Sequence, residues 1–257
     1  MQALVPRHPA PFPAAVSWLD EANRDGGSGP TASAVAIPVG GVALVLHVPD
    51  ANRDRPRAEP ILSISEQSRL AQILHPRALA EFLAGRLMIR TTLGHLLGLD
   101  PADVVLHESP RGALSLDPAH HQTDLCFNLS HTDGLVVLAI ARQPVGVDVE
   151  WLDRTGRTVE LADRYFARTE TASLRALPET AQRDRFFDLW TLKEAYIKAR
   201  GLGLALPLGG FAFMGFESPP LSIAVDQAHA DRPDSHWSFG TWDAAITRHR
   251  VAVALAA

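Results

Sequence analysis

Two acidic residues alternate with valines in the segment Gly146 to Glu150, which reads Gly-Val-Asp-Val-Glu. This alternation is typical of a β-strand, in which every second side chain points to the same face. Asp148 and Glu150 would share one face, while Val147 and Val149 would point into the core. Neighbouring carboxylates repel each other unless a cation joins them, and Mg²⁺ prefers such oxygen ligands. The alternative is a half-exposed strand end with two solvated acids.

A second candidate is a helical segment in which Trp190, Glu194 and Lys198 are four residues apart and therefore share a face. Glu194 could supply a third carboxylate to a metal, and Lys193 and Lys198 could neutralise phosphate oxygens. The alternative is an exposed Glu194–Lys198 pair, which would contribute roughly a few tenths of a kcal/mol.

A third candidate is the pair Ser130 and His131, at the end of an expected strand. His131 could donate to a phosphate oxygen, although a lone histidine is also common as a structural residue. No Gly-x-Ser-x-Gly segment occurs, so nothing favours a serine hydrolase. His120 and His121 lack metal-ligand spacing and are expected on the surface.

The hydrophobic pattern predicts the elements that must position these residues. Long helices are expected at 76–97 and about 183–200, and the polar stretch 49–60 is expected to be a loop. Shorter helices are expected at 159–166 and 169–177. Strands are expected at 42–48, 125–129, 135–141, 145–151, 211–216, 221–225, 237–242 and 251–255.

Three parts are expected along the chain. Residues 1–33 are rich in proline and end in a linker-like Gly-Gly-Ser-Gly-Pro run, which predicts a peripheral N-terminal extension. An N-terminal subdomain, 34–143, and a C-terminal subdomain with the metal site, 144–257, would follow. Each half has a valine-rich strand and a long helix, so one ligand cleft between them is expected. Any two strand-and-helix units would look similarly alike.

The composition excludes several classes of protein. Of the 257 residues, 46% are hydrophobic and 21% are charged, which excludes disorder over most of the length. The formal net charge of -5 argues against a general nucleic-acid-binding protein. The single cysteine, Cys126, excludes an internal disulfide and a cysteine-rich zinc site. No membrane span or signal peptide is recognised, so a cytoplasmic protein is expected.

Taken in order, the three candidate segments resemble the 4'-phosphopantetheinyl transferase superfamily, of the larger type that activates surfactin and enterobactin synthetases. The family pattern combines Asn-x-Ser-His, Gly-x-Asp-x-Glu and Trp-x-x-Lys-Glu-Ala-x-x-Lys-x-x-Gly-x-Gly-Leu. These segments are 128–131, 146–150 and 190–204 here, and every named position matches. The segment 164–170 resembles a family helix and turn that ends in a carboxylate, Glu170. The resemblance extends from about residue 41 to the C-terminus.

The resemblance implies an α+β fold of two pseudo-symmetric α/β subdomains, each a small sheet packed on a long helix, with a ligand cleft between them. It implies transfer of the 4'-phosphopantetheine arm of coenzyme A, the co-substrate, to a serine of an acyl or peptidyl carrier protein. Adenosine 3',5'-bisphosphate would be released, and Mg²⁺ would be the cofactor. The enzyme would be a cytoplasmic monomer in peptide, polyketide or fatty acid biosynthesis, without membrane or nucleic-acid partners.

The resemblance also implies roles for single residues. Asp148, Glu150 and Glu194 would hold Mg²⁺ against the pyrophosphate. Lys198 would neutralise pyrophosphate charge, with Lys193 as the weaker candidate. Glu194, or a water that it orients, would be the base for the serine proton, and Glu170 is the second choice.

The other end of coenzyme A would meet a different set of residues. Ser130 and His131 would bind the 3'-phosphate, helped by Arg86, whose segment 81–86 resembles the siderophore-synthetase branch. Many relatives have a Gly-Lys-Pro loop near the adenine. This chain has Arg-Gly-Ala-Leu at 111–114, so that lysine contact is absent.

Two alternative functions remain open: a Mg²⁺-dependent nucleotide pyrophosphate hydrolase, and a non-catalytic coenzyme A-binding protein. The complete acidic and lysine positions argue against the second. Because carrier proteins are acidic around the modified serine, a basic docking patch is expected. The candidates for this patch are Arg154, Arg157, Arg164, Arg168 and Arg175.

Overall fold

The computed structural model describes residues 4–19, 35–110, 112–119, 121–156, 158–226, 236–244 and 247–257. The expected features at 20–33, Arg111, His120 and Arg157 lie outside these ranges. Contacts divide the chain into two units. The N-terminal unit is Ala14–Arg142, and the C-terminal unit is Gln143–Ala257 together with the chain before Ala14.

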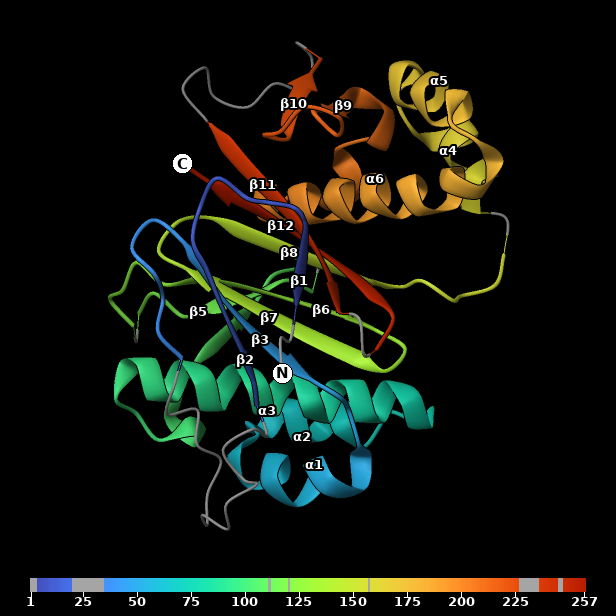
Figure 1. Ribbon diagram of the computed structural model, residues 1–257. Helices are drawn as coiled ribbons and strands as arrows, with labels where there is room; N and C mark the ends of the chain where they lie inside the picture. Colours follow the sequence, from blue (N-terminus) through green and yellow to red (C-terminus); the bar gives the residue numbers. More distant parts are fainter. Residues whose placement is uncertain are drawn as a thin grey trace. The chain divides into compact units, whose positions relative to one another are not determined.

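The N-terminal unit is built on a four-stranded sheet in the order β2-β3-β7-β6 (Figure 1). Strand β2 is parallel to β3, and the other pairs are antiparallel. Helix α3 packs against β3 and β7, and α1 packs against α3. The elements of this unit are β2 (Ala14–Trp18), β3 (Val42–His47), α1 (Ala51–Ala58), α2 (Ile64–Leu70), α3 (Pro76–Leu97), β4 (Leu106–Glu108), β5 (Leu114–Leu116), β6 (Cys126–Thr132) and β7 (Leu135–Ala141).

Local sequence explains where the helices of this unit begin. Helix α3 begins at Pro76, whose fixed φ suits a first helical position, and ends before Gly98 in the left-handed conformation. The expected loop at 49–60 is wrong, because the Asp50 carboxylate accepts hydrogen bonds from two backbone N–H groups and caps α1. Helix α1 contains Pro56 and still forms. Ser63 and Glu66 form a capping box that begins α2.

The C-terminal unit repeats this plan with an antiparallel sheet in the order β1-β11-β12-β8. Helix α6 packs on β8 and β12, and a separate hairpin is formed by β9 and β10. The elements are β1 (Val5–His8), β8 (Val145–Trp151), α4 (Thr158–Tyr165), α5 (Arg168–Ala176), α6 (Glu179–Arg200), β9 (Phe211–Met214), β10 (Ser222–Val225), β11 (Trp237–Ala244) and β12 (His249–Ala256).

The expected α+β fold is confirmed. In each unit a four-stranded sheet packs against a helix of 22 residues, α3 or α6. Apolar side chains of the long helix and of the strands form the core of each unit. No helix in the described ranges is both long and apolar enough to cross a membrane.

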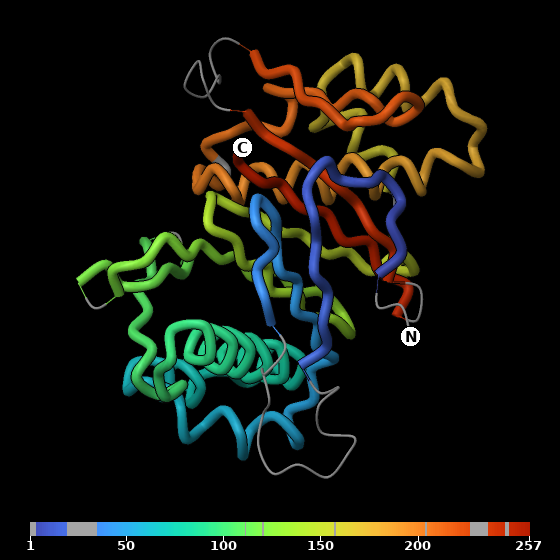
Figure 2. Tube along the Cα trace, turned by 60° about the vertical axis from the view of Figure 1, so that its left-hand side comes forward, coloured from blue at the N-terminus to red at the C-terminus, as the bar shows by residue number. Residues whose placement is uncertain are grey.

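The described part of the expected N-terminal extension is not peripheral (Figure 2). Strand β1 pairs with β11 at the edge of the C-terminal sheet, and β2 pairs with β3 in the N-terminal sheet. The proline content of this segment concealed both strands, because proline is tolerated in edge strands and between strands. Leu4 and Leu19 are buried in the structure.

A buried network of charges fixes β1 to its unit. Asp188 of α6 is fully buried and accepts hydrogen bonds from Arg7 of β1 (2.9 Å) and from Arg250 of β12. Arg250 also donates to Asp184 (2.8 Å) and Asp243 (2.6 Å). Burial alone would raise the pKa of Asp188, but hydrogen bonds and the arginine charges lower it. Each buried charge therefore has a partner, as stability requires.

We expect Arg7→Gln to lower the free energy of unfolding by about 1–3 kcal/mol, because it removes one cationic partner from a buried carboxylate. Urea denaturation would measure the change. Arg55→Gln is the matched control, because Arg55 pairs with Glu59 on an exposed face and should matter little. Equal effects of the two substitutions would contradict a structural role for β1.

Candidate functional site

Strand β8 and helix α6 lie unusually close together at Gly146. A Cβ atom at this position would lie 2.0 Å from the backbone oxygen of Ala195 and 2.5 Å from the nitrogen of Ala199. Only glycine fits there, because both neighbours are backbone atoms of a packed helix. The contact places the Asp148 side of β8 against the face of α6 that bears Glu194 and Lys198.

The alternation expected for β8 gives buried rather than solvated acids. Val147 and Val149 are buried, and Asp148 on the opposite face is only 6% exposed. The Lys198 ammonium donates to Asp148 Oδ1 at 2.7 Å. The interpretation of this segment as a solvated strand end is therefore wrong, and so is that of an exposed Glu194–Lys198 pair.

Glu150 is held by two groups. The guanidinium of Arg154 donates to its carboxylate at 2.9 Å, and the Trp190 side chain also hydrogen-bonds to it. Arg154 lies over the rings of Phe187 and Trp190. Burial and the nearby charge of Asp148 raise the pKa of Glu150 to about 7, although Arg154 and Trp190 oppose the shift. The site thus holds more negative charge than its own cations neutralise.

Glu194 belongs to the same electrostatic cluster. Burial, followed by the charge of Asp148, raises its pKa, while Lys198 acts in the opposite direction. Across the described ranges, no three His, Cys, Asp or Glu side chains are arranged to hold a metal ion. The structure still brings Asp148, Glu150, Glu194 and Lys198 into one region, where the Lys198 ammonium pairs with the Asp148 carboxylate.

Lys193 and Glu170 lie elsewhere, as an internal ion pair. The two side chains are fully buried and 2.7 Å apart, and Lys193 also donates to the carbonyls of Leu208 and Phe211. Burial lowers the pKa of Lys193 to about 8, and Glu170 opposes that shift. These side chains hold α5, α6 and β9 together and do not join the acidic cluster, so the structure gives no support to Lys193 as a phosphate ligand or to Glu170 as a base.

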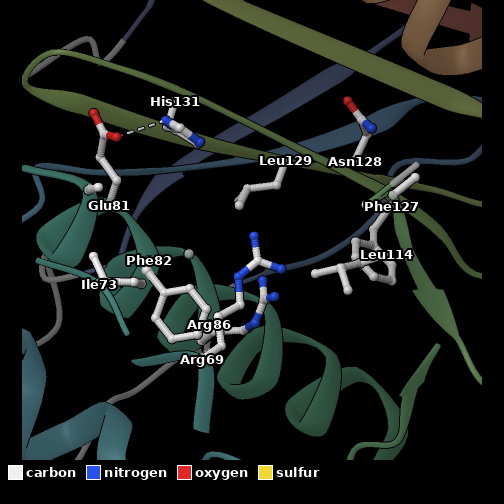
Figure 3. Close-up of a pocket in the computed structure, with 14 residues that line it drawn as sticks. Arg69, Ile73, Glu81, Phe82, Arg86, Leu114, Phe127, Asn128, Leu129 and His131 are labelled. Atoms are coloured by element: carbon white, nitrogen blue, oxygen red, sulfur yellow. Dashed lines mark ion pairs between the residues drawn. The ribbon is translucent and has the colours of Figure 1, made fainter. Parts of the chain in front are cut away.

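The N-terminal unit contains a pocket of about 430 Å³ between α3, β6 and the segment around β5 (Figure 3). Phe82, Leu114, Phe127 and Leu129 give it apolar walls. Its polar groups include Arg69, Arg86 and His131. A pocket with apolar walls and a few convergent cations suits a flat, negatively charged ligand.

His131 is oriented in this pocket by α3. Its Nδ1 lies 3.1 Å from Oε2 of Glu81, and the other carboxylate oxygen, Oε1, accepts a hydrogen bond from Arg77 at 2.7 Å. Ser130 is buried and does not line the pocket, because the next residue of a strand points to the other face. The structure therefore brings His131 and Arg86 together, and separates Ser130 from them.

Arg86 shares one carboxylate with a second arginine. Its Nε lies 2.8 Å from Glu66, and Arg90 Nη2 lies 2.7 Å from the other oxygen of the same group. Burial lowers the pKa of Arg86, and the charge of Glu66 opposes this. Two guanidiniums on one carboxylate leave positive charge on the Arg86 side of the pocket, whereas Glu81 lines the side near His131, so an anion is favoured at Arg86.

The expected basic patch is smaller than the sequence suggested. Arg154 is engaged with Glu150, and Arg175 pairs with Asp163 at the surface. Arg164 and Arg168 are exposed and make no ion pair with a described residue. They flank Tyr165, which is exposed and lies under the Arg164 guanidinium.

Sequence reasoning missed three groups of the two sites. Glu81 orients His131, Arg69 lines the N-terminal pocket, and Arg154 neutralises Glu150. Glu81 could have been found, since it follows Arg77 by four residues and so forms an i,i+4 pair. Arg154 was expected in the basic docking patch instead. It also follows Glu150 by four residues, but outside a helix this spacing does not predict a contact, because a loop residue's direction depends on tertiary packing.

We expect Gly146→Ala to lower the free energy of unfolding by about 3 kcal/mol, since α6 must move away from β8. Thermal and urea denaturation would measure it. Gly209→Ala is the control, because its Cβ would meet Tyr165 O at 3.4 Å, an ordinary contact. Similar small losses for both variants would contradict the close approach.

The raised pKa of Glu150 predicts a pH dependence of stability. The ordinary pKa of this carboxyl is 4.5, and its pKa in the folded protein is about 7. The folded protein therefore holds this proton more tightly than the unfolded chain does. The contribution to stability is fully present below pH 4.5 and is lost as the pH rises through 7. Without metal, we expect Glu150→Gln to stabilise the protein at pH 8 by about 2 kcal/mol and to flatten the dependence. Melting temperatures between pH 5.5 and 8 would show this. Glu160→Gln, at an exposed site, should change neither, and a wild-type slope in Glu150→Gln would refute the assignment.

Two family models match this chain. Residues 144–256 match the 4'-phosphopantetheinyl transferase superfamily, and residues 54–143 match the 4'-phosphopantetheinyl transferase N-terminal model. The first match includes the acidic site, and the second includes all the residues that line the N-terminal pocket.

Characterised relatives agree with the family models. The chain is 38% identical over 146 residues to the 4'-phosphopantetheinyl transferase HetI of Nostoc sp., covering 56% of this chain and 61% of the relative. It is 32% identical over 168 residues to a 4'-phosphopantetheinyl transferase of Bacillus subtilis, covering 65% of this chain and 73% of the relative. It is 29% identical over 221 residues to the human L-aminoadipate-semialdehyde dehydrogenase-phosphopantetheinyl transferase, covering 77% and 70%. The match thus spans less than two thirds of the Nostoc relative. The chain belongs to the 4'-phosphopantetheinyl transferase superfamily, as its three motifs predicted.

Proposed function

We propose that this protein transfers the 4'-phosphopantetheine arm of coenzyme A to a serine of an acyl or peptidyl carrier protein and releases adenosine 3',5'-bisphosphate. The main support is the partly buried cluster of Asp148, Glu150, Glu194 and Lys198, which combines the acids and the cation that phosphoryl transfer needs. Family membership supports the same reaction. A cytoplasmic location is part of the proposal.

The acidic cluster suits Mg²⁺. Its donors are carboxylate oxygens, the ligand type that Mg²⁺ prefers. Burial, followed by the nearby charge of Asp148, raises the pKa values of Glu150 and Glu194, and a bound cation would oppose both effects. The Lys198 ammonium on Asp148 occupies the place of a cation. Asp148, Glu150 and Glu194 would hold the ion. When bound, it would supply Lewis-acid stabilisation of the pyrophosphate.

The protein's own residues would perform the remaining steps. Lys198 would turn from Asp148 to the pyrophosphate and neutralise the charge that develops on the leaving phosphate. Glu194, or a water that it orients, would accept the proton of the carrier serine. Its raised pKa moves it toward the range of an effective base at neutral pH. The Glu150 carboxylate stays fixed by Arg154 and Trp190.

The nucleotide end of coenzyme A would use the pocket of the N-terminal unit. His131 and Arg86 would bind the 3'-phosphate, since both line the pocket and the second arginine on Glu66 leaves positive charge on the Arg86 side. Phe82 and Leu114 would contact the adenine in place of the absent lysine loop. Ser130 has no such role in this proposal, because it does not line the pocket.

We expect purified protein, coenzyme A and Mg²⁺ to increase the mass of an apo carrier protein by one phosphopantetheine group, detected by mass spectrometry. Asp148→Asn and Glu194→Gln should lower turnover by about a thousandfold or more, because they remove charge at the reacting group. Both should remain folded, since crowded acids contribute little stability without a metal.

Val149→Ala is the control for these variants. It should lower stability through lost packing and retain its Mg²⁺ requirement. Formation of adenosine 3',5'-bisphosphate with an unmodified carrier would instead indicate the hydrolase, and coenzyme A binding without either product would indicate a binding protein. Wild-type turnover in Asp148→Asn would contradict the proposed metal site.

We further propose that the carrier docks where α4 meets α5, at Arg164, Tyr165 and Arg168. This exposed aromatic residue between two cations complements an acidic surface. Arg164→Glu with Arg168→Glu should raise the KM for the carrier by about tenfold at low salt, with a smaller effect at high salt. The KM for coenzyme A should not change. Arg55→Glu with Arg142→Glu, at two exposed sites elsewhere, is the control with the same change of net charge. An unchanged carrier KM in the Arg164 and Arg168 double variant would exclude this surface.

A further inference from the structure

The C-terminal unit contains a second pocket of about 430 Å³, which includes none of the four residues of the acidic cluster. Helix α5 packs against both α6 and β9 (Figure 1), and residues of these three elements line the pocket. Its walls are largely apolar and come from Leu174 of α5, Leu189 of α6, and Phe213 and Phe216 in and after β9. The pocket size is in the range that binds small organic molecules.

One cation lines this pocket without a strong partner. The side chain of Arg185 is 14% exposed, and its guanidinium lies 4.3 Å from the ring centre of Phe216. It donates to Glu217 at 2.7 Å, but the Glu217 side chain is 79% exposed. Its Nε is buried, makes no hydrogen bond within the described part of the chain, and lies 3.9 Å from Asp188. An exposed carboxylate is a weak and replaceable partner for a buried guanidinium.

Besides Arg185 and Glu217, the charged residue Glu170 lines the pocket, and it does not repel an anion strongly. The Glu170 carboxylate is neutralised by Lys193 and accepts hydrogen bonds from the backbone of Phe213 and Ala167.

Near β9 the backbone turns tightly at Gly215, whose φ is 92° and where a Cβ would lie 2.4 Å from Pro220 O. The two residues that follow, Phe216 and Glu217, contact Arg185.

We propose that this pocket binds a small organic carboxylate with an apolar chain of medium length. The ligand carboxylate replaces Glu217 on the Arg185 guanidinium, and its chain lies against Leu174, Leu189 and Phe213. An anionic head and an apolar tail match the single available cation and the apolar walls. This inference concerns a site separate from the acidic cluster and does not depend on the proposed transfer reaction.

Calorimetric titration of the full-length protein with octanoate tests the proposal, with octanamide as the uncharged probe of equal length. We expect octanoate to bind at one site and octanamide to bind at least about tenfold more weakly. Arg185→Gln should weaken octanoate binding by about tenfold or more. Glu217→Gln should strengthen it by about threefold, because it removes the competing carboxylate. Arg175→Gln, an equal change of charge on α5 outside the pocket, should have no effect.

Ser173→Phe keeps Arg185 and should also abolish binding, because the ring would fill a pocket that Ser173 lines. This second variant preserves the test if Arg185→Gln does not fold. Octanoate affinity unchanged by Arg185→Gln or Ser173→Phe would place the ligand elsewhere and overturn the proposal. So would a wild-type protein and a Glu217→Gln variant that bind no octanoate at about 10 mM. Phosphopantetheine transfer would be assayed on the same variants as a separate measurement. Loss of octanoate binding can therefore be distinguished from loss of transfer activity.

Discussion

The contact between β8 and α6 at Gly146 is the constraint on which the acidic site depends. At this point two backbones approach within the space that a single methyl group would need. The register of the helix on the strand is therefore fixed, and the face with Trp190, Glu194 and Lys198 meets the face with Asp148 and Glu150. A side chain at 146 would separate these groups, because two packed backbones cannot yield as a flexible side chain can.

Buried charges divide into two kinds in this protein. Lys193 with Glu170 is a closed pair, and Arg250 with Asp188 is the centre of a charge network; both hold strands and helices together. The acidic cluster and the N-terminal pocket are unbalanced, in opposite directions. In the acidic cluster, three acids share the cations of Lys198 and Arg154. Beside the N-terminal pocket, two arginines share the single carboxylate of Glu66. Unbalanced charge is unfavourable for folding, so its presence in both units indicates sites for charged ligands.

The two units use one architectural plan for different chemistry. In each, a long helix covers a four-stranded sheet and ends in a left-handed glycine, Gly98 or Gly201. An edge strand of the sheet supplies functional side chains in both cases: β6 presents His131, and β8 presents Asp148 and Glu150. In the N-terminal unit the neighbouring helix contributes arginines, and in the C-terminal unit it contributes an acid and a lysine. The same scaffold therefore forms a pocket that favours an anion in the N-terminal unit and an acidic cluster that favours a cation in the C-terminal unit.

The sequence by itself determined the strongly periodic elements and the motif residues. Helix 76–97 and strands 135–141 and 145–151 were predicted with their observed bounds, because hydrophobic periodicity and capping residues are local properties. The spacing within β8 and α6 also placed each acid on the correct face, since that depends only on the geometry of the element.

The tertiary structure alone decided which of these side chains meet a ligand. Lys193 and Glu194 are neighbours in sequence, yet one is locked inside an ion pair and the other joins the acidic cluster. Strands β1 and β2 form only because partners from distant parts of the chain complete their hydrogen bonds. Pairing and burial depend on residues far away in sequence, and no local pattern contains that information.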